Sequence, residues 1–584
     1  MAENNNTGLI QTGKNPDLAT FQILIDGKEI PGTYPVTSIA VRKELNRIAT
    51  AKVTFFDGAP SEQKFAISDS DYFVPGKKIQ INAGYHSDNQ TIYKGIIIRH
   101  SVKARLNGSS LIIECKDEAI KMTVGRKSRY FYDSTDSDVF SQLTSEYKLD
   151  TAIEDTTFKH EELIQYNSSD WDFMLSRAQA NGKVCFTDNG SLSIKKPDFE
   201  QDPIETIAYG MTIMDFDAEI DARTQFSKVS AFSWNQADQE IAEIEANNPQ
   251  IALNGNLDQD KLAKVIGLEN LELKHGGNLE NAEAQDWANS KMLFQQMAKV
   301  RGRVRFQGID KVKPGVILKL EGIGDRFNGK IYVSAVQHII ADGTWTVDAQ
   351  FGMDPVWFSE TYDINDAPAA GLLPAVKGLQ YGIVSQLQDD PKGECRILVK
   401  FPIVNSEEQG TWCRVATLDA GENRGSFFLP EIGDEVLVGF INEDPNNAVI
   451  VGMLNSSAKP APLTAEDANN VKGFVTRSEI KFLFDDEKKS VTIETPAGKK
   501  VIIDDDAGEI TLQDENSNIV KLSSDGVSIE SGKDLILKAK GDVTVEGMNI
   551  SLTGQAEVKA SGNAGTELSS SATTVIKGSI VQIN

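Results

Sequence analysis

Apolar and polar residues alternate in very short steps from Val491 to Asn584. Such period-two alternation predicts β-strands with one buried face, because successive side chains of a strand point to opposite sides. Glycines separate the steps, so each predicted strand spans only about five to seven residues. The steps between 510 and 552 carry the apolar residues Ile510, Leu512, Val520, Leu522, Val527, Ile529, Leu535, Leu537, Val543, Val545, Ile550 and Leu552.

These predicted strands are too short to close a core within one chain. Each would bury two or three side chains, and a lone ribbon would leave its hydrogen-bonding edges open. The segment also contains no aromatic residue that could thicken a core. Three identical ribbons wound about one axis would cover each other's apolar faces and edges. We therefore predict one third of an intertwined trimeric β-prism, a rigid needle whose core these residues line.

The first 362 residues predict strands mixed with a few helices. We expect strands over 18–125, with a hairpin turn at Asn107-Gly108. Apolar residues at helical spacing predict helices at 136–147 and 282–299, and a further helix that opens at Ser169 and stops at Asn181-Gly182. Residues 236–280 are polar and partly helical, and we interpret them as an insertion.

A loose internal repeat joins two parts of this region. Pro75-Gly76 and Pro314-Gly315 each precede alternating apolar positions, a glycine and a second turn. The repeat predicts two similar small β-barrels, and chance similarity between β-hairpins is the alternative. Three chains would then present six barrels, a number that fits a sixfold ring.

Composition and turn signals divide the chain into five parts. We predict a hub of two β-barrel units with helical inserts at 1–362, a linker at 363–377 and a compact β unit at 378–455. A second linker, or neck, at 456–488 leads into the needle at 489–584. The predicted fold class is therefore mainly β and multidomain.

Bulk properties exclude several classes of protein. A net charge of −26 argues against a nucleic-acid partner, because phosphate binding needs a basic surface. It also disfavours stable insertion into anionic membranes, and no apolar run approaches the length of a membrane-spanning helix. The cysteines lack CxxC spacing and predict buried free thiols in a reducing compartment. The polar N-terminus lacks the apolar stretch of a secretory signal, so we expect synthesis in the cytoplasm without a signal peptide.

The motifs contain no convincing catalytic or metal site. His160 opens a His-Glu-Glu sequence but lacks the second histidine of a zinc protease, which predicts an exposed helix or loop. The aspartates at 504–506 lack the spacing of a calcium loop, so we interpret them as solvated turn residues. The basic stretch 125–129 predicts an inter-domain salt-bridge patch, and Trp171 is predicted to be a core residue. We therefore expect no enzyme activity, no cofactor and no metal.

Four features, taken in order along the chain, point to one family. Residues 165–173 contain a Gln-Tyr-Asn-Ser-Ser-Asp-Trp-Asp-Phe sequence that matches a hub-domain signature, to which we assign a structural role. Its matching residues are Gln165, Tyr166, Asp170, Trp171 and Phe173. Residues 378–455 match an OB-fold domain, for example at Gly382-x-Val384 and over 425–438. With the glycine-rich prism and the ending 576–584, these stretches resemble the VgrG-type spike proteins of contractile injection systems.

The resemblance implies a homotrimeric structural spike at the tip of such a system. The hub would meet inner-tube and baseplate proteins, and the OB-fold would serve as an adaptor. Sheath contraction would drive the trimer through a target envelope, with effector proteins as cargo. The gap between the OB-fold and the needle is too short for the lysozyme domain of phage spikes. The end of the needle would dock a separate PAAR-like tip protein through Gly578, Ser579, Ile580, Val581, Gln582, Ile583 and Asn584.

Two alternatives stay open. The machine is either an extracellular contractile particle, which the stretch 125–133 favours, or a type VI secretion system. The chain would accordingly be released outside the cell in an assembled particle or delivered into a target cell. The rival function is a β-solenoid carbohydrate-binding adhesin or a tailspike-like glycan-degrading enzyme. That rival predicts aromatic and paired acidic residues on the needle, and residues 491–584 contain no aromatic residue.

Overall fold

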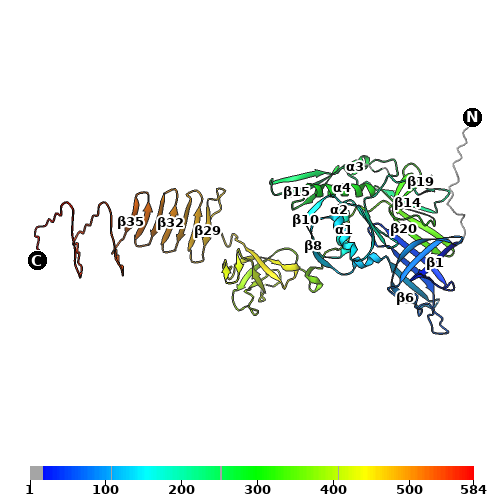
Figure 1. The fold of residues 1–584 in the computed structure, drawn as a ribbon, viewed down its shortest axis with the longest axis horizontal. Coiled ribbons are helices and arrows are strands. Elements are labelled where there is room, and N and C mark those ends of the chain that lie inside the picture. The colour runs from blue at the N-terminus through cyan, green and yellow to red at the C-terminus, as the bar shows by residue number, and fades with distance from the viewer. Residues whose placement is uncertain (1–17, 107, 250, 252, 406, 584) are drawn as a thin grey trace, which may run out of the picture. The chain divides into compact units, whose positions relative to one another are not determined.

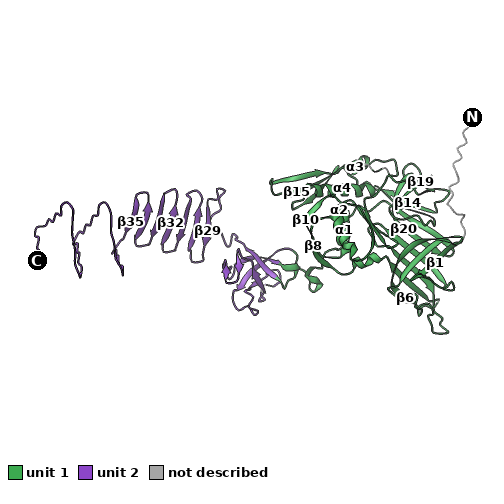
Figure 2. Ribbon diagram, viewed as in Figure 1, with its two compact units in different colours: residues 1–377, 440–447 green, residues 378–439, 448–584 purple. Residues whose placement is uncertain are grey.

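The computed structural model describes residues 18–106, 108–249, 251, 253–405 and 407–583. The N-terminal segment 1–17, in which we expect no secretory signal, lies outside the described residues, as do the turn residue Asn107 and the predicted docking residue Asn584. The chain divides into two compact units, which are coloured separately in Figure 2. Unit 1 comprises residues 1–377 and 440–447, and unit 2 comprises residues 378–439 and 448–584.

A sheet of thirteen strands dominates unit 1 (Figure 1). Its strand order is β14-β18-β21-β20-β3-β4-β7-β6-β5-β1-β2, and β13 and β19 pair beside this path. The strands are β1 (Ala19–Ile25), β2 (Lys28–Glu29), β3 (Val36–Glu44), β4 (Thr50–Phe56), β5 (Lys78–Tyr85), β6 (Asp88–Lys103), β7 (Ser110–Lys116), β13 (Glu205–Ala208), β14 (Asp215–Ile220), β18 (Val300–Gln307), β19 (Ile317–Glu321), β20 (Gly329–Ala341) and β21 (Thr344–Phe351). Two separate apolar cores lie against it, one around Val53 and Ile81 and the other around Val304 and Val347.

The internal repeat is present in three dimensions. Antiparallel strands β5, β6 and β7 follow the turn at Gly76, and β19, β20 and β21 follow the turn at Gly315 in the same order. Both glycines have left-handed backbone angles (φ of 99° and 88°), which glycine adopts without steric cost. Both amides donate a 2.8 Å hydrogen bond to the middle strand, Gly76 to Ile97 and Gly315 to Val333. The two predicted barrel units are joined, because β20 pairs with β3 and merges them into one sheet.

Helices and two small sheets complete the unit. The helices are η1 (Glu118–Thr123), α1 (Asp136–Ser145), α2 (Asp170–Ala180), α3 (Gln259–Ile266), α4 (Asn281–Met297), α5 (Phe358–Thr361), η2 (Pro368–Gly371) and η3 (Ile441–Glu443). One sheet pairs β8 (Lys127–Thr135) with β10 (Lys159–Ser168), and the other contains β9 (Asp150–Ile153), β11 (Val184–Asp188) and β12 (Ser191–Lys195). The helices predicted at 136–147, 169–181 and 282–299 are confirmed as α1, α2 and α4. None of the helices in the described part of the chain is long and apolar enough to span a membrane.

The insertion at 236–280 is more ordered than its composition predicts. β15 (Lys228–Asn235) pairs with β16 (Glu240–Glu245) on one side and with β17 (Asn270–His275) on the other, and α3 follows β16 in the chain. Val229 and Ala231 of β15 share a small core with Ala284 and Met292 of α4. These strands were not predicted because polar and charged residues, glutamates above all, occupy many of their exposed positions.

Unit 2 begins with a closed barrel of order β22-β23-β24-β28-β27. Its strands are β22 (Gln380–Gln386), β23 (Ile397–Lys400), β24 (Thr411–Val415), β27 (Glu435–Phe440) and β28 (Ala448–Met453), and a short ribbon pairs β25 (Ala420–Gly421) with β26 (Arg424–Gly425). Val384, Val399, Val436 and Ile450 are buried in it. A small closed five-stranded barrel is the architecture of the OB-fold, as the sequence resemblance predicts.

A seven-stranded antiparallel meander follows the barrel. Its strands are β29 (Val471–Val475), β30 (Lys481–Asp485), β31 (Ser490–Glu494), β32 (Lys500–Asp504), β33 (Glu509–Gln513), β34 (Ile519–Ser523) and β35 (Gly526–Glu530). From β29 to β34, every second strand starts 19 residues further on, at residues 471, 490 and 509 and again at 481, 500 and 519. This repeat was not among the features predicted from the sequence.

One prediction for this region is wrong. The sequence predicts a linker at 456–488, but β29 and β30 lie within it. Phe474, Phe482 and Phe484 are among the apolar residues of these two strands, which the aromatic-free pattern of the later strands did not suggest. The steps at 535–537, 543–545, 550–552 and 581–583 predict strands of a shared trimeric prism, and residues 531–583 carry no strand in the single chain. A strand needs a hydrogen-bonded neighbour, and the described residues of this chain offer these steps no partner strand.

Candidate functional site

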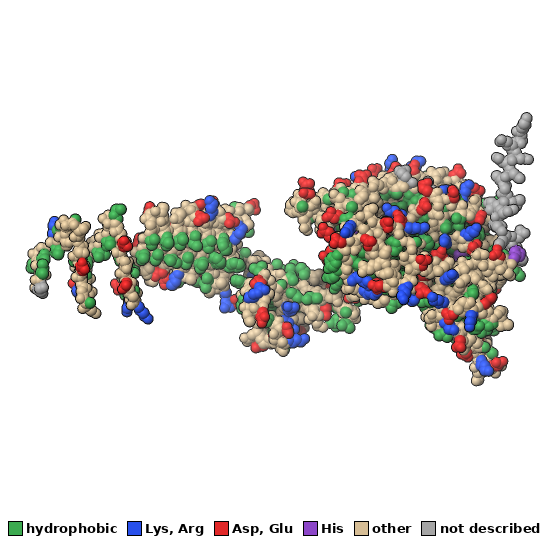
Figure 3. Space-filling view, viewed as in Figure 1, with side chains coloured by type: hydrophobic (Ala, Val, Ile, Leu, Met, Phe, Trp, Pro, Cys, Tyr) green, Lys and Arg blue, Asp and Glu red, His purple; other side chains and the backbone are tan. Residues whose placement is uncertain are grey.

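The meander has one apolar face. Ile510 pairs with Leu522, Leu512 with Val520 and Leu522 with Val527, and residues paired across a sheet point to the same side. Figure 3 shows the result as a continuous band of apolar side chains along the sheet. We name this surface the needle face. It consists of Phe474, Phe482, Phe484, Val491, Ile493, Val501, Ile503, Ile510, Leu512, Val520, Leu522, Val527 and Ile529.

The needle face includes only part of the predicted core residues. Those from Ile510 to Ile529 belong to it. The remaining predicted residues lie exposed in the segment without strands: Leu535, Leu537, Val543, Val545, Ile550 and Leu552. The residues from Phe474 to Ile503 are additional, and the same alternation in β30, β31 and β32 would have identified them. The face is open in the single chain, where Ile503 is 45% and Ile529 is 52% exposed.

The opposite face of the meander is largely polar. The carboxylate of Glu494 on β31 forms an ion pair with the ammonium of Lys500 on β32 at 3.1 Å. It also lies 3.6 Å from the ammonium of Lys481 on β30. Glu509 and Lys521 form a further ion pair across β33 and β34. Such exposed pairs contribute little stability, but they are compatible with water. The sheet is therefore amphipathic, with one face suited to solvent and one suited to burial.

Asp170 anchors the predicted hub signature in unit 1. Its buried carboxylate accepts hydrogen bonds from the Gln165 amide at 2.9 Å, the Tyr147 hydroxyl at 2.6 Å and the Lys127 ammonium at 2.7 Å. Arg129 adds a contact at 3.3 Å. Burial alone would raise the pKa of Asp170, but these hydrogen bonds hold it below its usual value. The basic stretch thus forms a salt-bridge patch within unit 1, rather than the inter-domain patch that the sequence predicts, and fastens β8 to the start of α2.

The other signature residues divide between the core and the surface. Trp171 lies in the core at 4% exposure, as predicted. Phe173 stacks on Phe131 of β8, with ring centroids 5.9 Å apart and planes at 10°. Ser169 caps α2 by accepting a hydrogen bond from the amide of Asp172. Tyr166, by contrast, is 79% exposed. No sequence pattern separates it from its buried neighbours.

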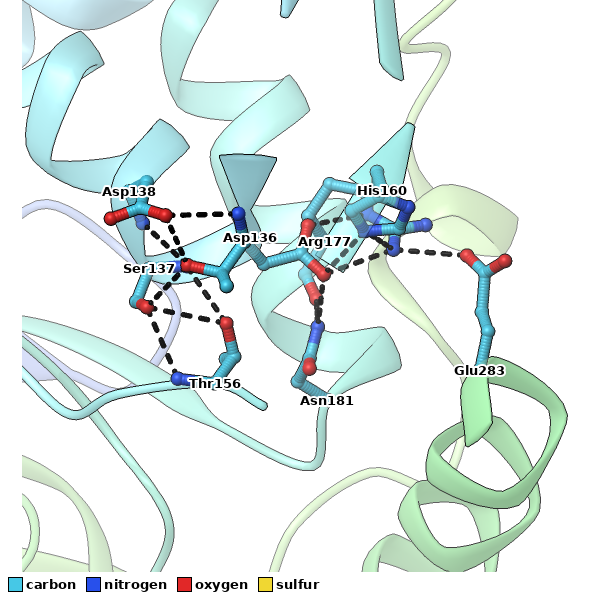
Figure 4. Close-up of polar contacts among 9 residues, drawn as sticks. Asp136, Ser137, Asp138, Thr156, His160, Arg177, Asn181 and Glu283 are labelled. Atoms are coloured by element: carbon cyan, nitrogen blue, oxygen red, sulfur yellow. Dashed lines mark hydrogen bonds and ion pairs between the residues drawn. The ribbon is translucent and has the colours of Figure 1, made fainter. Parts of the chain in front are cut away.

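A second buried polar cluster joins three helices around Asp136 (Figure 4). Arg177 of α2 donates to Asp136 of α1 at 2.8 Å and to Glu283 of α4 at 3.0 Å. Asn181 donates to the same carboxylate at 2.9 Å, and the Nε2 atom of His160 lies 3.1 Å from it. His160 is a buried residue of β10, so the prediction of an exposed helix or loop is wrong. Its burial depends on these distant partners, which local sequence does not show.

The electrostatics of this cluster favour a structural role. Burial alone would raise the pKa of Asp136, but hydrogen bonds from His160, Arg177 and Asn181 hold it well below its usual range. A carboxylate held ionised in this way is a poor proton donor near neutral pH. Among the residues that the structure describes, no group of three or more His, Cys, Asp or Glu side chains is placed to hold a metal.

The remaining predicted positions lie on the surface of unit 2. Asp504 ends β32 and accepts a hydrogen bond from the amide of Ala507 at 2.8 Å, which makes it a turn residue as predicted. The predicted docking residues 578–583 are exposed and carry no strand. The structure brings them into no cluster.

Each of the two units matches a known protein family over part of its length. Residues 15–342 match the family described as the Alg8 N-terminal domain, which covers more than half of the chain. Residues 380–454 match the type VI secretion system/phage-baseplate injector OB domain. The latter match coincides with the closed barrel of unit 2.

Curated relatives are spike proteins. The chain is 26% identical over 222 residues to the type VI secretion system spike protein VgrG1b of Pseudomonas aeruginosa, a match over 35% of this chain and 29% of that protein. It is 36% identical over 76 residues to the spike protein VgrG3 of Vibrio cholerae, over 12% of this chain and 8% of that protein. The chain thus spans less than a third of the length of either relative.

Solved structures of low identity accompany these matches. The 43 kDa tail protein of prophage MuSo2 from Shewanella oneidensis superposes with a TM-score of 0.44 and 9% identity, over 58% of this chain and 98% of that chain. From the matched N-terminal region, the injector OB domain and the curated relatives together, we conclude that the chain belongs to the Alg8 N-terminal domain family and is a VgrG-type spike protein.

Proposed function

We propose that three copies of this chain form the structural spike of a contractile injection system. The observation that carries this proposal is the needle face, which extends over all seven strands of the meander and lies open in the single chain. A continuous exposed apolar surface marks a place where another molecule packs. The opposite face carries ion pairs, so the partner belongs on one side only.

Three copies fit this surface better than two. Each strand of the meander has five residues and places at most two apolar side chains on the needle face. Two such narrow faces would form a thin sandwich with open edges, and open edges promote further association. Three faces arranged as a triangular prism would enclose one apolar core and set each edge beside a neighbour.

The segment 531–583 supports pairing between copies. It keeps the alternation of a strand, for example at Leu535-x-Leu537 and Ile550-x-Leu552, but pairs with no strand among the described residues of the chain. In an intertwined prism the other two copies would supply the missing hydrogen bonds and cover the apolar side chains. We therefore propose that pairing within the chain gives way to pairing between chains after Glu530.

Each unit has its own proposed partner. In unit 2, exposed Ile580, Val581 and Ile583 offer apolar contact to a PAAR-like tip protein. Deleting 578–584 should abolish co-purification of a co-expressed tip protein and leave the mass of the spike assembly unchanged. Retained co-purification would contradict this docking site. Unit 1 would meet inner-tube and baseplate proteins.

The machine that we favour is an extracellular contractile particle, with a type VI secretion system as the second candidate and effector proteins as cargo. Sheath contraction would supply the work and the spike would supply stiffness, without a catalytic step in the described residues. The stretch 125–133 supports the first candidate. Sedimentation of the growth medium tests it, because released particles would carry this chain together with sheath protein. A chain found only with the cells would favour the second candidate.

A glycan-binding adhesin or glycan-degrading enzyme is the rival. It predicts aromatic and acidic residues together on the needle surface. The aromatic residues of the meander are Phe474, Phe482 and Phe484, and all three lie on the needle face among aliphatic side chains, where a shared core would bury them. A glycan-array signal that requires residues 471–583 would favour the rival.

Light scattering of the purified full chain tests the main proposal. The spike should have three times the 63.9 kDa mass of the chain. A stable, folded monomer would contradict the proposal, because the needle face would then stay open to water.

A further inference from the structure

The two-stranded ribbon of β8 and β10 presents tyrosines to solvent. Tyr130 pairs with Ile164, and Tyr132 pairs with Glu162. The rings of Tyr130 and Tyr132 stack with centroids 6.0 Å apart and planes at 12°. Tyr130, Tyr132 and Tyr166 are 60%, 62% and 79% exposed. We name Tyr130, Tyr132, Ile164 and Tyr166 the tyrosine ribbon.

The ribbon is held firmly from behind. Between the two exposed tyrosines, Phe131 points inward and stacks on Phe173 of α2. Gln165, beside Tyr166, is buried and donates to Asp170, which also accepts from Lys127 of β8. Exposed aromatic side chains on a rigid support lose little conformational freedom when a partner covers them. Tyrosine is also enriched at the buried centre of protein interfaces.

A second, chemically different patch lies on the loop between β13 and β14. Tyr209, Met211 and Met214 are exposed there, the methionines at 60% and 59%. The backbone of this loop is fixed, because the amide of Tyr209 donates to Glu321 at 2.9 Å and that of Met214 to Arg305 at 2.8 Å. We name residues 209–214 the methionine loop. Methionine sulfur packs favourably against aromatic rings, so the loop complements the tyrosine ribbon.

We propose that, in the assembled spike, the tyrosine ribbon of one copy packs against the methionine loop of the next copy. Contacts in a ring of three are heterologous, so each chain must present two unlike surfaces that fit each other. The ribbon and the loop are two such surfaces on one unit. This inference rests on the proposed trimer and adds the contact that holds unit 1 within it. It also gives a role to Tyr166, which the hub signature left unexplained.

Cross-linking between engineered cysteines tests this contact in the full chain. The sequence predicts buried cysteines, but Cys395 is exposed, so the experiment uses a Cys395→Ser background. The double variant Tyr132→Cys/Met211→Cys is treated with a short bismaleimide and separated on a denaturing gel. We expect covalent dimers and trimers. Each single variant should remain monomeric on the gel, because an unlike contact never brings two copies of the same residue together.

A second cysteine pair and a stability measurement complete the test. Tyr166→Cys/Met214→Cys repeats the cross-link at other positions. Replacing Tyr130, Tyr132 and Tyr166 together by serine should raise the concentration at which the trimer dissociates by about tenfold or more. The control is Ile241→Ser, a similarly exposed position on β16, which should leave that concentration unchanged.

The outcomes separate this inference from the proposed function. A trimeric mass without cross-links in either double variant overturns the inference and leaves the trimer standing. The inference is also overturned if the triple serine variant dissociates at the same concentration as the parent chain. A tube or baseplate protein then becomes the candidate partner for the tyrosine ribbon. A monomeric parent chain overturns the proposed function itself.

Discussion

Replacing Ile503 with aspartate should prevent assembly of the spike. Ile503 lies in the middle of the needle face and is 45% exposed in the single chain. About half of the 1.5–3 kcal/mol that burying such a side chain provides is therefore gained only when another copy covers it. A carboxylate placed there would also lose its hydration, at a cost of several kcal/mol for each ion. Summed over three copies, the loss is on the order of 10 kcal/mol.

The matched control is the neighbouring substitution Ile502→Asp. Ile502 pairs with Thr492 and Thr511 on the opposite face of the same strand, so a partly exposed carboxylate there would lie among hydroxyl groups and outside the proposed shared core. The expected cost is about 1 kcal/mol or less, with the trimer retained. Light scattering and sedimentation across a dilution series measure both variants. If both dissociate alike, or if Ile503→Asp stays trimeric, the needle face is not the shared core.

The remaining predictions concern the stability of unit 1, measured by urea unfolding of the full chain. Asp170→Asn removes charged hydrogen bonds to partly exposed partners and should lower the free energy of unfolding by about 2–3 kcal/mol. Asp188→Asn leaves the buried ammonium of Lys43 without its carboxylate and should cost about 3–5 kcal/mol. The lowered pKa values of Asp136 and Asp170 contribute stability above about pH 4, which is lost as pH falls towards their folded values. An Asp136→Asn variant should therefore be less stable near neutral pH and show a flatter acid dependence, and an unchanged pH profile would contradict the assignment.

Local periodicity was sufficient to place the residues of the later meander strands on one face. Side chains alternate along a strand whatever its partners are, so Ile510, Leu512, Val520 and Leu522 could be grouped from sequence alone. The first strands of the meander, β29 and β30, could not be predicted in the same way. Its first strands use phenylalanine where later strands use valine and isoleucine, and a pattern defined by the absence of aromatics excluded them.

Other features depend on partners that local sequence does not display. His160 is polar and lies next to two glutamates, yet Asp136 and Arg177 make its burial favourable. The alternations after Glu530 have the pattern of strands, but hydrogen-bonded pairing requires a neighbour that the chain itself does not provide. Tyr166 and Gln165 are adjacent in one signature, and only the packing of β10 against α2 decides which of them faces solvent.

The 19-residue repeat of the meander sets the length of the needle in units of one repeat. One repeat adds two strands, and neighbouring strands lie about 4.8 Å apart, so each repeat extends the sheet by roughly 10 Å. Two added strands return the chain to its original direction with the same side chains facing inward. Duplication or deletion of one such segment would therefore change the length in fixed increments and leave the register of every other strand intact. A lineage could match its spike to thicker or thinner target envelopes without redesigning a single buried contact.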